Sequence, residues 1–157
     1  MPDGSPRRWE VYDMWSTFGP YSSIGKGNRM NEIYEYDPES DVLEVHFGEK
    51  RPAWTIELTD NITISIDRGT RQARSLLFLD FTELIRPTPM GPRSFPLTGL
   101  ADLPIAERDL VIEILTTQPV ASWLDVSAVQ ELPDSPFAVT HLETPPPDVL
   151  KLVTVAA

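Results

Sequence analysis

The chain has 157 residues, of which 41% are hydrophobic, and a formal net charge of −11 at pH 7. This length is enough for one good core, and the absence of cysteine excludes disulfides, thiolate zinc sites and cysteine nucleophiles. The acidic excess repels phosphate backbones, so we expect no nucleic-acid partner. No apolar run approaches the ~18 residues of a membrane span, so we expect no membrane association and a cytoplasmic location. A basic protein partner, a cation or simple solubility would each be compatible with the charge.

Residues 1–29 differ in pattern from the rest of the chain, because they are rich in Gly, Ser, Pro and aromatic residues and follow no sustained period. One interpretation is that Met30 is the natural start and that the first 29 residues are an N-terminal extension, either flexible or not native. The other is that this segment docks on a sheet through its apolar side chains. Those side chains are Trp9, Val11, Met14, Trp15 and Phe18. Both interpretations stay open.

A strand pattern begins at Ile33, where apolar and polar residues start to alternate with a period of two. Residues 37–40 read Asp-Pro-Glu-Ser, which favours a type I turn. A four-residue loop, residues 38–41, would place Tyr36 opposite Leu43 and gather the apolar side chains on one face. The pattern therefore predicts a β-hairpin whose other face is polar and solvated.

Two further strands and a turn follow in residues 54–66. A three-residue loop, residues 59–61, would pair Leu58 with Ile62, and it needs one left-handed residue, a conformation that Asn61 tolerates. Residues 73–81 contain four consecutive apolar side chains, so this strand should be covered on both faces. We therefore expect residues 30–86 to form an antiparallel β-meander module.

The second half begins with a Pro/Gly-rich connector at residues 87–99. A helix is predicted from about Pro104 to Thr117, with Asp102 as its cap. Two strands should follow, at residues 122–132 and 137–143, and the apolar tail at residues 149–155 reads as a final strand or a docking segment. We expect residues 100–157 to pack on the meander as one domain. The predicted fold class is thus α+β, mainly antiparallel sheet, with one α-helix in the C-terminal half.

No motif in the chain indicates catalysis. The two histidines, His46 and His141, lack convergent partners in the pattern, and we expect the first to be solvated and the second half-buried. The acidic residues of the 37–41 turn are explained by turn formation and lack the features of a calcium loop. We therefore predict no catalytic, cofactor-binding or metal-binding residues and no cofactor.

One short basic stretch stands out in the acidic chain and is the candidate interaction surface. It consists of Arg68, Arg71 and Arg74. The alternative interpretation is a solvated turn that protects a sheet edge from aggregation.

Residues 36–43 read Tyr-Asp-Pro-Glu-Ser-Asp-Val-Leu. With the strands that follow, they resemble a small bacterial and archaeal protein family of unknown function, whose hallmark is Tyr-Asp-Pro-Glu-x-Asp-x-Leu. The resemblance covers roughly residues 31–84. It departs from the family at Glu44, where an aromatic residue is usual, and at residues 75–79, which replace a Gly and a Glu of the closing strand. The resemblance implies a small antiparallel sheet without assigned activity, and some members are suspected antitoxins.

Three functions are consistent with these observations. The first is a non-enzymatic protein-binding module, antitoxin-like, whose acidic surface masks a basic partner. The second is a structural or oligomerisation domain that forms a homo-oligomer. The third is an enzyme that uses carboxylates or a divalent cation. The lack of a catalytic motif favours a protein that is not an enzyme.

Overall fold

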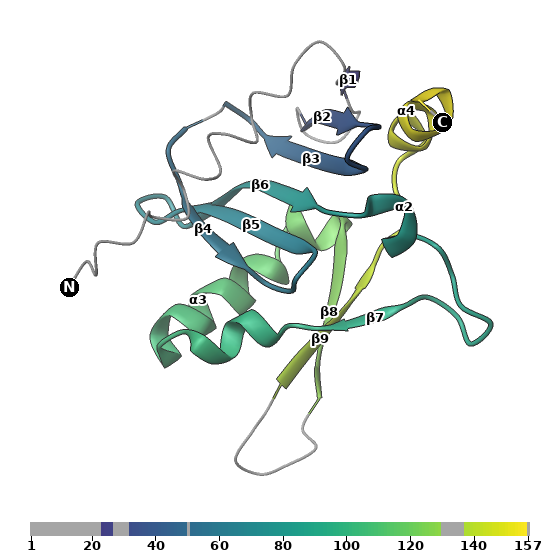
Figure 1. Ribbon diagram of the computed structural model, residues 1–157. Coiled ribbons are helices and arrows are strands. Elements are labelled where there is room, and N and C mark those ends of the chain that lie inside the picture. Colours follow the sequence, from purple (N-terminus) through teal and green to yellow (C-terminus); the bar gives the residue numbers. More distant parts are fainter. Residues whose placement is uncertain (1–22, 27–31, 50, 130–136, 157) are drawn as a thin grey trace.

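The computed structural model describes residues 23–26, 32–49, 51–129 and 137–156, and they form two antiparallel sheets with short helices (Figure 1). The large sheet contains β1 (Ser23–Lys26), β2 (Glu32–Asp37), β3 (Val42–Phe47), β4 (Trp54–Glu57), β5 (Ile62–Asp67) and β6 (Gln72–Phe78). The small sheet contains β7 (Ser94–Pro96), β8 (Leu124–Val129) and β9 (Phe137–Leu142). The helices are α2 (Phe81–Leu84), α3 (Ile105–Leu115), α4 (Pro147–Ala156) and two 3-10 turns, η1 (Thr98–Asp102) and η2 (Val120–Ser122). The predicted α+β class with mainly antiparallel sheet is confirmed.

The first hairpin has the predicted register. Tyr36 pairs with Leu43 and Tyr34 with Val45 across β2 and β3, so these four side chains lie together on the core face. Ile33 and Val42 occupy the alternate positions and lie on the opposite face. The turn at residues 38–41 closes with Asp41 in the left-handed region, at φ 55°. The alternation in the sequence was therefore sufficient to place every side chain of this hairpin on its face.

The strand order differs from that of a simple meander. The large sheet runs β1-β2-β3-β6-β5-β4, so that β6 lies next to β3 and β4 lies at the edge. The prediction that the closing strand is covered on both faces is confirmed. Leu76, Leu77 and Phe78 of β6 are all buried, although consecutive side chains of a strand point to opposite faces of the sheet.

The second hairpin has the predicted pairing but a different loop conformation. Ile56 pairs with Ile64, and the Leu58 N–H donates to the Ile62 carbonyl. The expectation of a left-handed Asn61 is wrong, because its φ is not positive. Instead the Thr59 hydroxyl accepts hydrogen bonds from the backbone N–H groups of Asn61 and Ile62. The loop is therefore stabilised by a side-chain acceptor, and it does not need a residue in the left-handed conformation.

The core lies between the large sheet and the second half of the chain. In Figure 1 the small sheet and α3 lie on one side of the large sheet. Trp123, from the loop before β8, is 1% exposed and contacts the rings of Tyr34 and Phe78. Its indole N–H donates to the buried carboxylate of Glu32. The buried apolar residues of both halves form a single cluster.

Two details of the second half differ from expectation. The predicted helix is present as α3, but its N-cap position is Pro104 and no side chain caps it, because Asp102 ends the preceding turn η1. The apolar tail is a second C-terminal helix, α4, rather than a strand. Val149, Leu152 and Val153 of α4 contribute to the core, and this i, i+3, i+4 spacing is helical. The connector also contains a short strand, β7.

The N-terminal segment contributes β1 to the large sheet, where it pairs with β2. The side chains expected to dock from residues 9–18 lie outside the described residues, and whether residues 1–29 form an extension stays a prediction. In the described parts of the chain, no helix has the length and apolar character needed to cross a membrane.

The turn between β5 and β6 depends on one carboxylate. Asp67 accepts hydrogen bonds from the backbone N–H groups of Gly69 and Thr70, and it pairs with Arg74 at 2.9 Å. The hydrogen bond from Arg74, followed by the one from Thr70, lowers the pKa of Asp67 below its ordinary value. A carboxyl with a lowered folded-state pKa stabilises the fold above its unfolded pKa of roughly 4, and the contribution is lost as pH falls through the folded value.

We therefore expect acid to destabilise the wild-type protein more than the Asp67→Asn variant. Urea unfolding at about pH 7 and about pH 2.5 measures the loss for each protein. Asp125→Asn, at an exposed position, is the control and should lose as much as the wild type. Equal acid sensitivity of Asp67→Asn and the wild type would contradict the prediction.

Candidate functional site

Two adjacent strands bring three ionisable side chains together on the face of the large sheet that lies opposite the core. Glu35 of β2 pairs directly with Glu44 of β3, and His46 follows two residues after Glu44 on the same face. In an antiparallel pair, directly opposed side chains are close neighbours, and like charges in these positions repel. The local β-structure therefore forces two carboxylates and one imidazole into contact.

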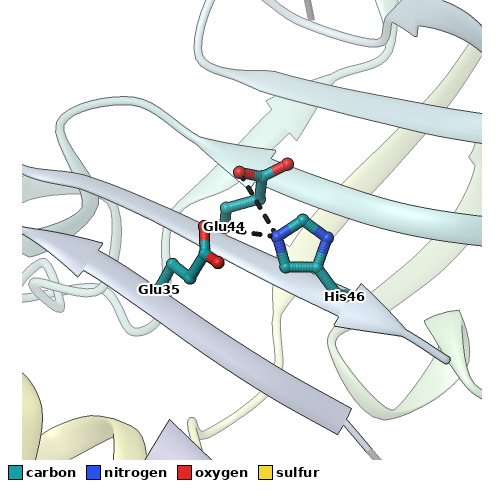
Figure 2. A group of neighbouring side chains, drawn as sticks. All are labelled: Glu35, Glu44 and His46. Atoms are coloured by element: carbon teal, nitrogen blue, oxygen red, sulfur yellow. Dashed lines mark ion pairs between the residues drawn. The ribbon is translucent and has the colours of Figure 1, made fainter. Parts of the chain in front are cut away.

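Figure 2 shows the three side chains converging on the imidazole Nε2 of His46. Nε2 lies 3.5 Å from Glu35 Oε2 and 3.4 Å from Glu44 Oε2. One ligand-type atom from each residue lies within 4.8 Å of the others. We call these three residues the Glu–Glu–His cluster.

The cluster is buried. Glu35 is 8% exposed, His46 2% and Glu44 0%. Among the residues that the structure describes, none donates a hydrogen bond to either oxygen of Glu44. The buried hydroxyl of Ser75 also has no hydrogen-bond partner among these residues. Ser75 pairs with His46 from the neighbouring strand β6. Buried polar atoms are almost always hydrogen-bonded, so these atoms are unusual and are available to a bound group.

The electrostatics of the cluster favour positive charge at its centre. Burial by itself lowers the pKa of His46, but Glu35 and Glu44 raise it by more, and the net shift is upward. Two carboxylates around one imidazole still carry an excess negative charge when the imidazole is protonated. A divalent cation could thus compensate the charge of both carboxylates.

The expectation that His46 is solvated is wrong, as is the expectation of a solvated face around it. The predicted hairpin register already placed Glu35 opposite Glu44 and His46 beside them. The cluster was missed because alternation shows which side chains share a face but does not show whether that face is covered. The expected half-burial of His141 is confirmed.

The three arginines of the candidate interaction surface do not converge. The Arg68 guanidinium lies 3.9 Å from the centre of the Trp54 ring and pairs with Glu107. Arg74 is the extra residue of a β-bulge and pairs with Asp67. Arg71 is exposed and, with Arg74, lines a cleft of about 510 Å³ next to α3. Two of the three are engaged within the chain, and their role as an interaction surface stays a prediction.

A second concave surface lies beside the edge strand β4. This groove of about 370 Å³ lies between β4, the loop after it, and η1. Of the described residues that line it, those that are ionisable are all acidic: Glu57, Asp60 and Asp102. Gly99 allows η1 to approach β4 closely, and its N–H donates to the carbonyl of Leu58. We call this surface the acidic groove.

Residues 33–70 match a family described as "Protein of unknown function (DUF2283)". This match supports the similarity to a small family of unknown function that the sequence indicated, and the matched segment contains Glu35, Glu44 and His46. No curated protein matches the chain, and no solved structure does so either. The chain is thus similar, over residues 33–70, to a family of unknown function.

Proposed function

We propose that this protein is a non-enzymatic binding module that recognises a basic, extended segment of a partner protein in the acidic groove. The observation that carries the proposal is the composition of the groove. Among the residues that the structure describes, three carboxylates line it and no basic residue does. A positively charged segment would be attracted there first by the field of a chain with net charge −11 and then by these local charges.

The position of the groove favours an extended segment over a helix. Among the described strands, β4 has a neighbour only on the side of β5. The outer side of an edge strand presents a row of backbone N–H and C=O groups that can pair with an added strand. Side chains of an added strand alternate between its two faces, so every second residue would face the acidic groove. A segment with Lys or Arg at alternate positions fits this surface.

An antitoxin-like role is the specific form of this proposal. A protein that masks a small basic toxin needs an acidic docking surface but no catalytic residues. The acidic groove, the net charge and the similarity to a family that includes suspected antitoxins support it. The partner would then be a small basic protein, and its gene would be expected next to the gene for this chain.

The groove can be tested with a peptide of about ten residues that alternates Lys or Arg with Thr or Val. We expect its addition to ¹⁵N-labelled protein to shift the amide resonances of β4 and η1 in NMR spectra. The double variant Asp60→Asn/Asp102→Asn should weaken binding roughly fivefold or more, since each exposed ion pair contributes up to about 1 kcal/mol. The control Glu39→Gln/Asp125→Asn changes net charge equally at exposed positions away from the groove.

The outcomes separate the alternatives. Equal weakening by both double variants would show that only net charge matters, and the acidic groove would be rejected. Shifts of β4 that grow with protein concentration, without peptide, would indicate strand pairing between two copies and support the oligomerisation alternative. Co-expression with the neighbouring gene product tests the antitoxin-like form, and a complex that survives Asp60→Asn/Asp102→Asn would contradict it.

A further inference from the structure

We propose that Glu35, Glu44 and His46 bind a single Zn²⁺ ion and that this ion has a structural role. The site lies on the face of the large sheet opposite the core and is separate from the acidic groove. The inference does not depend on the proposed binding function. Three observations carry it: charge, distance and unsatisfied polar atoms.

The first observation is the charge of the cluster. Two carboxylates occupy directly opposed positions and both are buried, which is unfavourable unless their charges are compensated. A protonated imidazole compensates only one of them. A divalent cation compensates both while the imidazole stays neutral, which is the form in which histidine binds metals.

The second observation is the spacing of the candidate ligand atoms. The distances of 3.4 and 3.5 Å from His46 Nε2 to the two carboxylates exceed the ~2.7–2.9 Å of a charge-assisted hydrogen bond. They match instead the edge of a tetrahedron around zinc, which is roughly 3.4 Å for metal–ligand bonds of ~2.1 Å. The imidazole thus lies as far from each carboxylate as it would around an ion, and the two carboxylates have ligand atoms within 4.8 Å of one another.

The third observation is the pair of Glu44 oxygens. Glu44 is fully buried and turned toward His46 (Figure 2), yet no described residue donates a hydrogen bond to it. Coordination to a metal would satisfy the Oε2 atom that faces His46. Three protein ligands leave the fourth position of zinc to a water molecule, and the unsatisfied hydroxyl of Ser75 is available on this face as a hydrogen-bond partner.

The ligand types select the metal and its role. Mg²⁺ and Ca²⁺ prefer sites made of oxygen atoms alone, whereas an imidazole with carboxylates suits zinc and the neighbouring first-row metals. Catalytic zinc sites also have three protein ligands and a water molecule, but their water position is open to substrate. The exposed fractions here are 8% or less, so the ion would be enclosed. Its effect would be to cross-link β2 and β3.

The test is thermal unfolding and calorimetric titration of the full chain after treatment with EDTA. We expect one Zn²⁺ per chain and a rise in melting temperature of roughly 5–10 °C at a hundredfold excess over the dissociation constant. Mg²⁺ or Ca²⁺ at the same concentration should cause no rise. Glu44→Gln should weaken zinc binding by more than the roughly 10–100-fold that an outer-shell residue contributes. Glu39→Gln, at an exposed turn position, is the matched control and should bind as the wild type does.

Metal-free Glu44→Gln distinguishes the proposal from a simple ion pair. If the cluster serves zinc, removing one buried charge should leave the metal-free variant at least as stable as the metal-free wild type. If Glu44 and His46 form only an ion pair, the variant should be less stable and zinc should not stabilise the wild type. That second pattern, or zinc binding unchanged in Glu44→Gln, would overturn the proposal.

A spectroscopic measurement on the wild type covers the case in which the variant does not fold. Co²⁺ reports geometry through its visible absorption, and we expect the intense bands of a four-coordinate site with nitrogen and oxygen ligands. A weak six-coordinate spectrum, or no binding of Co²⁺, would reject the assigned site.

Discussion

Asp41→Ala is expected to lower the free energy of unfolding by about 3–4 kcal/mol. The side chain of Asp41 accepts hydrogen bonds from the Tyr36 hydroxyl and from both the backbone N–H and the hydroxyl of Thr82. Its backbone carbonyl accepts a further bond from Phe81. The residue therefore ties the turn of the first hairpin to α2. The three side-chain hydrogen bonds are only part-buried, so we count about 1 kcal/mol net for each of them and about 1 kcal/mol for a left-handed Ala.

The hydrogen bond with Asp41 also changes the pKa of Tyr36. Burial, and then the hydrogen bond to Asp41, raise the pKa of its hydroxyl far above the ordinary value. The hydroxyl of Tyr36 thus stays protonated, and remains a hydrogen-bond donor, at neutral and moderately alkaline pH. This hydrogen bond accounts for Tyr36 and Asp41 of the Tyr-Asp-Pro-Glu-Ser-Asp stretch through folding alone.

Urea unfolding of three variants tests the role of Asp41. Asp41→Asn should lose about half as much stability as Asp41→Ala, because Asn tolerates the left-handed conformation but lacks the charge. Glu39→Ala, in the same turn and exposed, should change stability by no more than about 0.5 kcal/mol. A small loss in Asp41→Ala, equal to that of Glu39→Ala, would show that the turn is not held by this carboxylate.

Gly99→Ala is expected to destabilise the protein by about 2–3 kcal/mol. A Cβ at this position would lie 1.7 Å from the backbone oxygen of Glu57 and 2.8 Å from its carbonyl carbon. The neighbour is main chain of the edge strand, so no side chain can rotate away to relieve the contact. Either β4 or η1 must move, and the hydrogen bond from Gly99 to Leu58 would be strained or lost.

Gly69→Ala is the matched control for this substitution. Its added Cβ would lie 3.3 Å from a side-chain oxygen of Asp67, which can shift slightly. We expect a loss below about 1 kcal/mol there. Because the acidic groove is formed by η1 and β4, Gly99→Ala should also weaken binding of the basic peptide, and Gly69→Ala should not. Unchanged stability in Gly99→Ala would contradict the close approach of η1 to β4.

The hairpin registers could be predicted because they depend on local patterns. Alternation with a period of two set the faces of β2 and β3, and the Asp-Pro turn set the loop length, so the Tyr36–Leu43 pairing followed. The helical tail could also have been found, since Val149, Leu152 and Val153 follow a helical period and Pro147 stands at the first position of α4. Its short length and apolar character made a strand look equally suitable.

The order of strands could not be predicted with the same reasoning. Each hairpin is encoded locally, but the position of β6 beside β3, with its side chains buried on both faces, involves strands that are far apart in the chain. That burial is a property of the whole assembly. The acidic groove likewise depends on the approach of Gly99 to β4, two elements that are far apart in the chain.

The sequence by itself determined the antiparallel β-character, the two hairpins, the acidic charge and the direct opposition of Glu35 and Glu44. Only the tertiary structure decided that this pair is buried with His46 and becomes a candidate zinc site. The physical reason is that a period of two assigns side chains to a face through bonded geometry alone. Whether water reaches that face depends on segments distant in the chain, whose packing no local pattern records.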